Sequence, residues 1–412
     1  MAKYRVKDGI GIIPDGTTEI ESRAFEGCAD LEAVVIPHSV IVIKDLAFSG
    51  CSNLRKVVIP NSVIIIGDMA FDGCSSLTKV IIPSSVEYIG LAAFGGCTSL
   101  TEIVIPNSVT KIRTEAFSGC TGLTEIAISD SVTEIGINAF SFCTGLNRIY
   151  VAKNNPKYDS RDHCNAIIES ATNTLISGCA TTVIPESVTV IGAAAFEGLD
   201  LTKIVIPNSV VKIESGAFSY CTNLTEVVIP ASVTEIESEI FDGCDALKII
   251  HVDEHNPIYD SRGNSNAIIE SETNTLILGC ANTIIPDSVS RIGEVAFAEC
   301  VSLTEIVIPN SVIEIEDFAF YNCTGLVKII IPDSVMRIGE SAFKGCMGLK
   351  IINVAENNPI YDSRENCNAI IESETNTLIF GYATTIIPDS VTRIGGSAFY
   401  GCSALTEINI PD

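Results

Sequence analysis

The sequence predicts a single β-rich solenoid, built by stacking short coils on one another. A stretch close to "LTEIVIPNSVTKIRTEAFSGC" (100–120) recurs along almost the whole chain, and Pro14, Pro37, Pro60 and Pro83 are each 23 residues apart. Of the 412 residues, 47% are hydrophobic and 18% are charged, which supplies enough apolar surface for a core. Length alone would suggest two or three domains, but an internal period of this size indicates one repeat array.

Each short unit is predicted to contain three elements. Ile103 and Ile105 alternate with polar or outward residues and define a first strand, which a proline ends. Residues 108–112 form a second β-prone run that buries Val and Ile. The segment "AFSGC" (116–120) is too short for a lasting helix and is predicted to make a helical or 3₁₀ turn. Phe117 is expected to fill the coil.

Counting along the register gives thirteen short units of 22 or 23 residues and three long units of 33 residues, at 152–184, 253–285 and 355–387. In the long units, "NAII" and "TLI" are β-prone runs separated by a polar turn, which predicts an inserted β-hairpin. The predicted organisation is therefore a partial N-terminal cap over residues 1–13 and one continuous solenoid over residues 14–412.

The unit L-x-x-I-x-I-P-x-S-V-x-x-I-x-x-x-A-F-x-G-C resembles the BspA-type leucine-rich repeat, also called the Treponema pallidum type, from residue 13 to residue 412. The inserted units resemble hairpins of gut Bacteroides members of that family. The resemblance implies a β-rich α/β repeat fold: a curved, right-handed leucine-rich-repeat solenoid with a parallel sheet on its concave side. It also implies bacterial surface proteins that bind host or neighbouring-cell proteins or glycans, with no known chemistry.

The chain is strongly acidic, with 51 acidic and 25 basic residues and a formal charge of −26. Such a surface repels nucleic-acid phosphates and anionic headgroups, so neither nucleic acid nor membrane is an expected partner. The acidic surface is explained by the need to keep a long, apolar repeat array soluble. The alternative explanation is that it attracts basic proteins or divalent cations. No stretch reaches the roughly 18 apolar residues that span a bilayer. The resemblance implies a cell-surface or secreted protein; the start lacks the apolar stretch of a signal peptide, so a cytoplasmic protein is the alternative.

Most of the sixteen cysteines fall in one column. Twelve occupy the last position of the "AF" turn: Cys28, Cys51, Cys74, Cys97, Cys120, Cys143, Cys221, Cys244, Cys300, Cys323, Cys346 and Cys402. Identical positions in a solenoid have no natural pairwise partner, so we expect small buried hydrophobes and no disulfide framework. Cys164 and Cys179 end one predicted hairpin, where a local disulfide is the alternative.

Neither a metal site nor a catalytic site is predicted, and no cofactor is expected. His251 and His255 flank Asp253, but they lie at a strand end and the other long units replace them. His38 and His163 are isolated, and no glycine-rich phosphate loop occurs.

The recurring "YDSR" stretch (158–161, 259–262 and 361–364) is the most suggestive polar motif. We expect Asp159 to cap a turn and Arg161 to pair with a nearby carboxylate, so that the hairpin is held to the stack. Calcium binding through the oxygens of this loop is the alternative.

One outward column is the candidate binding surface. The residues between the inward aliphatic pair of each first strand should point outward on the concave sheet: Val35, Val58, Ile81, Val104, Ala127, Tyr150, Val183, Val205, Val228, His251, Ile284, Val307, Ile330, Asn353, Ile386 and Asn409. The candidate binding residues are Glu102, Val104, Arg148, Tyr150, Lys203, Val205, Val228 and His251. Stabilisation of stacked strands by β-branched side chains is the alternative explanation of the column.

The leading hypothesis for function is a non-catalytic recognition or adhesion protein. A structural or self-assembling surface component is the first alternative, and a polysaccharide-active enzyme on a solenoid scaffold is the second. "LTEINIPD" (405–412) is predicted to complete a strand at Ile410 with no coil after it. We therefore expect either truncation from a longer protein or end-to-end pairing of two chains.

Overall fold

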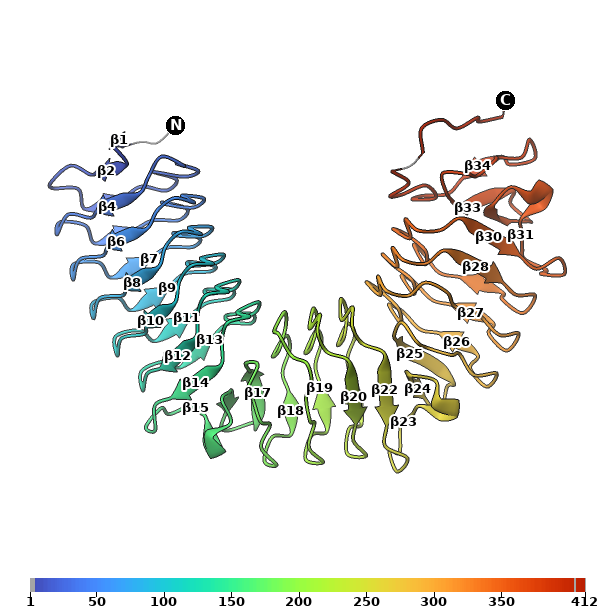
Figure 1. The fold of residues 1–412 in the computed structure, drawn as a ribbon, viewed down its shortest axis with the longest axis horizontal. Helices are drawn as coiled ribbons and strands as arrows, with labels where there is room; N and C mark the ends of the chain where they lie inside the picture. The colour runs from blue at the N-terminus through green and yellow to red at the C-terminus, as the bar shows by residue number, and fades with distance from the viewer. Residues whose placement is uncertain (1–3, 404, 412) are drawn as a thin grey trace. The chain divides into compact units, whose positions relative to one another are not determined.

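The computed structural model describes residues 4–403 and 405–411, which form two compact units. The first unit contains the residues up to Leu201 together with Ser209–Cys221, and the second contains Thr202–Asn208 and the residues from Thr222 onward. Nearly all regular structure in the described residues is β-strand, with only three short 3₁₀ segments. Each unit is a stack of coils, so the chain is a solenoid of parallel sheets (Figure 1).

The first strands contribute one column in each unit. In β10, Ile103 is buried between exposed Glu102 and Val104, so the alternation expected of a half-buried strand is present. These strands in the first unit are β2 (Ile10–Ile12), β4 (Ala33–Val35), β6 (Lys56–Val58), β8 (Lys79–Ile81), β10 (Glu102–Val104), β12 (Glu125–Ile128) and β14 (Arg148–Val151). In the second unit they are β20 (Glu226–Ile229), β22 (Ile249–Val252), β28 (Lys328–Ile331) and β30 (Ile351–Val354).

The second strands contribute another column of only two residues per coil. In the first unit they are β3 (Glu19–Ile20), β5 (Val42–Ile43), β7 (Ile65–Ile66), β9 (Tyr88–Ile89), β11 (Lys111–Ile112), β13 (Glu134–Ile135), β18 (Val190–Ile191) and β19 (Lys212–Ile213). In the second unit they are β21 (Glu235–Ile236), β26 (Arg291–Ile292), β27 (Glu314–Ile315), β29 (Arg337–Ile338) and β34 (Arg393–Ile394).

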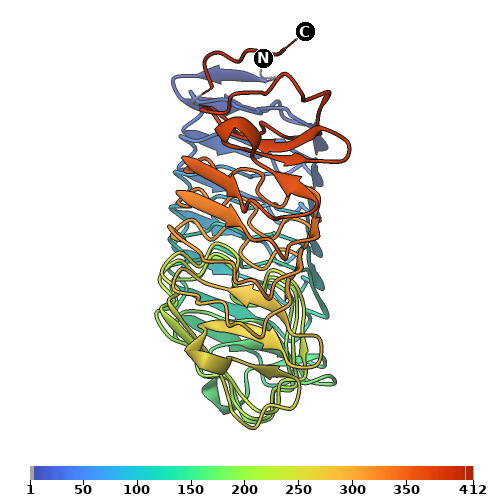
Figure 2. The ribbon, with the colours of Figure 1, turned by 90° about the vertical axis from the view of Figure 1, so that its right-hand side faces the viewer.

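Where ladders form in the two columns, neighbouring strands pair in parallel and in register; in the first-strand column the ladder from β2 to β10 is separate from the β12–β14 pair. Glu102 of β10 lies opposite Lys79 of β8, and Lys111 of β11 lies opposite Tyr88 of β9. In Figure 2 the strands of the blue, N-terminal coils follow one another as parallel rungs. The start of the chain adds an antiparallel strand, β1 (Arg5–Lys7), on β2, so residues 5–12 form a hairpin at the first coil.

The first-strand column is interrupted, which corrects the regular pattern expected from the repeat. Residues 201–206 contain no strand, 303–308 contain only an isolated bridge from Glu305 to Lys328, and 405–411 contain no strand at Ile410. For 303–308 the reason lies in the preceding long unit, where residues 281–286 are a turn and irregular chain. The segment 303–308 therefore has an extended neighbour on one side only, β28, and makes a single bridge to it.

The "AF" segments are turns, and in the described residues none is an α-helix or a 3₁₀ helix, contrary to the expected helical or 3₁₀ turn. The residue before Ala-Phe has a left-handed backbone, as at Leu46 (φ 60°) and Ala92 (φ 47°), and so does the glycine two residues after Phe, as at Gly119 (φ 72°). Two left-handed residues within one turn break the run of right-handed dihedrals that a helix needs. Glycine adopts this conformation without steric cost, although Phe142 (φ 59°) and Tyr220 (φ 57°) adopt it at the same position of other coils.

The turns are held by a hydrogen-bond ladder between coils. Phe48 N–H donates to the carbonyl of Ala70 at 2.8 Å, and Phe71 N–H donates to Ala93 at 2.8 Å. The phenyl rings follow the same column: Phe71 lies 5.1 Å from Phe48 and 5.3 Å from Phe94, with interplanar angles of 5° and 4°. Each coil therefore satisfies the backbone and the core of its neighbour, as the repeat predicts.

The cysteine column lies beneath these turns, as expected. Cys51 and Cys143 are fully buried, and their Sγ atoms donate to the carbonyls of Phe25 (3.0 Å) and Phe117 (3.2 Å) of the preceding coils. Burial raises the pKa of both thiols to about 12. All sixteen cysteines lie in the described residues and none forms a disulfide, Cys164 and Cys179 included.

Thermal stability should therefore be independent of reductant. With and without dithiothreitol, the Tm followed by circular dichroism is expected to agree within about 2 °C, because no cross-link constrains the unfolded chain. A fall of Tm by more than about 5 °C on reduction would show that bridges form in the protein in solution.

The long units insert three short strands into the second-strand column. The first contains β15 (Tyr158–Asp159), η1 (Arg161–His163), β16 (Ile167–Glu169) and β17 (Thr174–Ser177). The second contains β23 (Tyr259–Asp260), η2 (Arg262–Asn264), β24 (Ala267–Glu270) and β25 (Thr275–Gly279). The third contains β31 (Tyr361–Asp362), η3 (Arg364–Asn366), β32 (Ala369–Glu372) and β33 (Thr377–Gly381). Within each, the three strands pair antiparallel, and the last pairs in parallel with the second strand of the next coil.

A glycine in each long unit takes the place of the missing "AF" turn. Gly178 N–H donates to the carbonyl of Ala195 at 2.8 Å, which continues the turn ladder. A Cβ on Gly178 would lie 2.2 Å from the ring of Phe196, and one on Gly279 would lie 2.1 Å from Phe297. Only glycine lets the next phenyl ring pack directly on the inserted strand.

Candidate functional site

The eight predicted binding residues are exposed but do not form one site. In the first unit, Glu102 and Val104 lie on β10, whereas Arg148 and Tyr150 lie two coils further along on β14. In the second unit, Val228 lies directly opposite His251 in the β20–β22 pair. The remaining two, Lys203 and Val205, lie in the segment 201–206, which has no strand.

Two ion pairs join neighbouring coils on this face. Lys79 Nζ lies 3.2 Å from Glu102 Oε2, and Arg148 Nη1 lies 3.7 Å from Glu125 Oε2. Both pairs are more than half exposed, so each contributes at most about 1 kcal/mol to stability. They leave the charged groups accessible to a ligand.

A hollow of about 610 Å³ opens where this face meets the first inserted unit. Its lining comes from β14 and from the loop around η1, and includes Arg148, Tyr150, Lys153, Arg161, His163 and Asn165. Tyr150 is 57% exposed. The volume of the hollow falls within the range of small-molecule sites. We name it the Tyr150 hollow.

The sequence predicts outward positions for Arg148 and Tyr150 but no role for Lys153 or for the isolated His163. They become neighbours because the loop 160–165 returns to the first-strand face: Val183 N–H donates to the carbonyl of Cys164 at 3.1 Å. Aligning the three long units would have singled them out, since the equivalents of Lys153 are Glu254 and Glu356.

The "YDSR" motif is a closed network in all three units. Arg161 binds Asp159 in bidentate fashion, with Nε–Oδ1 at 2.7 Å and Nη2–Oδ2 at 2.6 Å, and its Nη1 donates to Asn173 Oδ1 at 2.8 Å. Burial acts to raise the pKa of Asp159, but hydrogen bonds from Arg161 and Ser170 outweigh it and hold the pKa below its usual value. The carboxylate is thus already paired, which matches the structural interpretation of the motif.

Two further contacts tie each insert to the coil before it. The Tyr158 hydroxyl accepts the amide of Ile135 at 3.1 Å, and Asn155 Nδ2 donates to the carbonyls of Ser129 (2.7 Å) and Val132 (2.8 Å). Tyr259 with Asn256, and Tyr361 with Asn358, repeat these bonds. The asparagine and tyrosine of the N-P-x-Y segment therefore anchor the hairpin.

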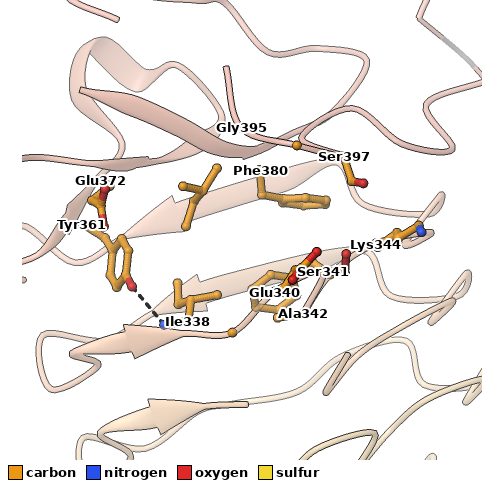
Figure 3. A pocket seen from close by; sticks show the side chains of 14 residues that line it. Ile338, Glu340, Ser341, Ala342, Lys344, Tyr361, Glu372, Phe380, Gly395 and Ser397 are labelled. Carbon is orange, nitrogen blue, oxygen red and sulfur yellow. Dashed lines mark hydrogen bonds between the residues drawn. The ribbon is translucent and has the colours of Figure 1, made fainter. Parts of the chain in front are cut away.

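A second hollow, of about 220 Å³, lies at the third insert, where an "AF" turn is missing (Figure 3). Phe380 and the phenyl ring of Phe343, 5.6 Å apart, line its apolar side, and Tyr361 at its edge is bonded to the amide of Ile338 at 2.9 Å. An equivalent of about 180 Å³ lies beside Tyr259 at the second insert.

At the first insert the same space is nearly closed. Phe142 packs against Gly198 and lies 5.8 Å from the ring of Tyr220, and the remaining volume is about 10 Å³. The hollows beside Tyr361 and Tyr259 thus follow from the geometry of the insertion. The Tyr150 hollow, whose lining differs from copy to copy, is the candidate functional site.

The histidines of the second insert have a local explanation. His255 donates its backbone amide to Asp253 Oδ1 at 2.9 Å, and its Nδ1 lies 3.2 Å from the same oxygen. The backbone bond is the largest factor that lowers the pKa of Asp253. Among the described residues, no group of three or more His, Cys, Asp or Glu side chains is arranged to hold a metal ion.

Stacked coils with two strand columns, a phenyl column and short turns define a repeat protein of the solenoid class. The chain belongs to the BspA-type leucine-rich repeat family: the model of the "BspA type Leucine rich repeat region (6 copies)" matches residues 18–147, 65–179, 176–262, 268–377 and 379–412. No curated protein matches the chain.

Solved structures of leucine-rich repeat proteins from bacteria are similar to this chain. A leucine-rich cell surface protein from Faecalibacterium prausnitzii is 30% identical over 82% of this chain and 83% of its own, with a TM-score of 0.48. A leucine-rich repeat protein from Eubacterium ventriosum is 24% identical over 86% and 95%, with a TM-score of 0.53, and supports the fold. One from Bacteroides ovatus is 26% identical over 96% and 77%, with a TM-score of 0.43.

As for membrane spans, the part of the chain that the structure describes has no helix of the length and apolarity needed to cross a bilayer.

Proposed function

We propose that this chain is a non-catalytic recognition protein that binds a protein or glycan partner through the outward side chains of its first strands. The observation that carries the proposal is the exposed column itself. In the first unit Val35, Val58, Ile81 and Val104 are between 51% and 68% exposed on successive paired strands. A contiguous apolar stripe of this kind is typical of interaction surfaces.

The proposed location is the bacterial cell surface or the medium outside the cell. The F. prausnitzii relative is described as a cell surface protein, and it covers most of this chain. Partners would then be proteins or glycans of a host or of neighbouring cells. We also propose the right-handed coil, the hand that parallel strands joined by a crossover almost always adopt.

Substitution of the column by threonine tests the proposal. Threonine keeps the β-branch that favours strands but removes the apolar contact, so V58T, I81T and V104T together should leave the Tm unchanged. Binding to immobilised mucin or extracellular-matrix proteins, measured by biolayer interferometry with the intact chain, should weaken at least about tenfold, or 1.4 kcal/mol. The matched control is I137T, since Ile137 is 62% exposed but lies outside the first strands.

Two outcomes would contradict the proposal. Affinities within twofold of the unsubstituted chain, with the Tm lowered, would assign the column to strand stability alone. Light scattering that grows with protein concentration and is abolished by the same threonine variant would favour the self-assembling component instead.

A further inference from the structure

The Tyr150 hollow is cationic on a chain whose formal charge is −26. Arg148, Lys153 and His163 line it from β14 and from the loop that contains η1. Arg161 and the carboxylate of Asp159 also line it, but they neutralise each other, because both oxygens of Asp159 bind the guanidinium of Arg161. The groups that face a ligand are therefore one guanidinium, one ammonium and one imidazole.

We propose that this hollow binds a sugar that carries a carboxylate, such as a uronic acid at the end of or within a glycan chain. The proposal rests on the proposed function, because the hollow is part of the first-strand face. Arg148 is the expected fork for the carboxylate, since its side chain is 71% exposed and its ion pair with Glu125, at 3.7 Å, is long and exposed enough for a ligand carboxylate to replace. Guanidinium–carboxylate pairs are strong and directional when bidentate.

The other walls favour a sugar over an acidic peptide. Ile149 and Val151 turn inward and are only 3% and 5% exposed, so the hollow offers no apolar pocket for a peptide side chain. Its large exposed apolar group is the aromatic ring of Tyr150, a flat platform with a polar hydroxyl. Ser160 and Asn165 add polar atoms to the rim. One flat apolar face within a polar rim matches a hydroxylated ring.

The two other inserts supply a built-in comparison. Where the first has Arg148, Tyr150, Lys153 and His163, the second has Ile249, His251, Glu254 and Asn264, and the third has Ile351, Asn353, Glu356 and Asn366. In the third insert the loop also closes on its strand, because Asn368 Oδ1 accepts the amide of Ile352 at 2.7 Å. The chain should therefore bind one carboxylated sugar per molecule.

Titration calorimetry with a galacturonate pentamer and the intact chain tests this inference. We expect one site per chain, and at least a tenfold loss of affinity in the variant R148I/Y150N/K153E, which carries three of the four residues of the third insert and should keep its fold. The uncharged galactose pentamer should bind at least tenfold more weakly than the galacturonate. A sulfated galactose pentamer separates recognition of the carboxylate from recognition of any anion.

The reverse exchange makes the test independent of folding defects in the first insert. In I351R/N353Y/E356K/N366H the stoichiometry of galacturonate is expected to rise from one to two per chain. Tyr150→Phe should cost less than Tyr150→Asn, since the ring remains.

Several results would overturn the inference: no galacturonate binding, affinity unchanged in R148I/Y150N/K153E, equal binding of the uncharged pentamer, equal binding of the sulfated pentamer, or tighter binding of a glutamate pentamer. These results are distinguishable from failure of the proposed function. If mucin or matrix binding survives R148I/Y150N/K153E but is lost in the V58T/I81T/V104T variant, the first-strand face is the recognition surface and only the sugar site is wrong.

Discussion

Replacing Phe71 by alanine is expected to lower the free energy of unfolding by about 3–5 kcal/mol. The ring is fully buried and stacks between Phe48 and Phe94, at 5.1 and 5.3 Å. Alanine would leave a cavity that cannot collapse, because the hydrogen-bond ladder of the turns fixes the spacing of the coils on both sides. The loss therefore combines the transfer of the ring with the cost of the void.

Guanidinium denaturation followed by circular dichroism measures the total loss, and amide hydrogen exchange locates it. The amide of Phe48, bonded to Ala70, should exchange faster in F71A, whereas the amide of Phe320, bonded to Ala342 in the second unit, should change less. Y150N is the control, because Tyr150 is exposed and the change should stay within about 0.5 kcal/mol. A loss in F71A below about 1 kcal/mol would mean that the phenyl column contributes little.

The columns of Phe, Cys and inward Ile could be predicted from the sequence because these residues recur at fixed positions of the repeat. In-register stacking then places every copy on the next, so Phe48, Phe71 and Phe94 become neighbours without any knowledge of side-chain geometry. The family and the solenoid class followed from the same period.

The backbone of the "AF" turn could not be predicted in this way. Gly119 indicates a left-handed residue, but Leu46 and Ala92 adopt the same conformation without any sequence mark, since the coil-to-coil ladder imposes it. The missing strand at 303–308 has a similar origin. The apolar pattern of residues 303–308 matches that of the other first strands. The strand is missing because the neighbouring segment of the insert is irregular.

The candidate site was predicted only in part for a related reason. Arg148 and Tyr150 lie on the repeat, so their outward direction could be deduced from strand alternation. Lys153 and His163 lie in the insert, where no periodicity applies; Lys153 follows β14 directly, and the return of the loop to the first-strand face brings His163 beside Tyr150.

The second large effect is expected from Asp242→Asn, which should stabilise the protein at neutral and alkaline pH. Burial, together with the negative charges of Glu239 and Glu299, raises the pKa of Asp242 from 3.8 to about 8. Glu299 lies in the coil beyond the second inserted unit, and Ser302 of that coil donates to the carbonyl of Asp245 at 2.5 Å, which brings the two turns together. This carboxyl group is therefore held in its neutral form by its surroundings.

The sign of the pH dependence follows from comparing the folded and unfolded chains. Below about pH 4 Asp242 is protonated in both the folded and the unfolded chain. The residue then does not lower the free energy of unfolding. Between about pH 4 and pH 8 the unfolded chain has released this proton and the folded chain has not, so stability falls as pH rises and then levels off. The full difference in pKa between 3.8 and about 8 corresponds to an upper limit of about 6 kcal/mol in the free energy of unfolding, and partial exposure of the side chain reduces it.

We expect the free energy of unfolding of D242N to exceed that of the unsubstituted chain by about 2–3 kcal/mol at pH 9 and to match it near pH 4, in denaturation curves at four pH values. The control is E26Q, at the same position of an exposed turn, which should change stability by less than about 0.5 kcal/mol at each pH. A D242N difference that is constant with pH, or that shrinks as pH rises, would show that Asp242 is ionised in the folded protein at neutral pH.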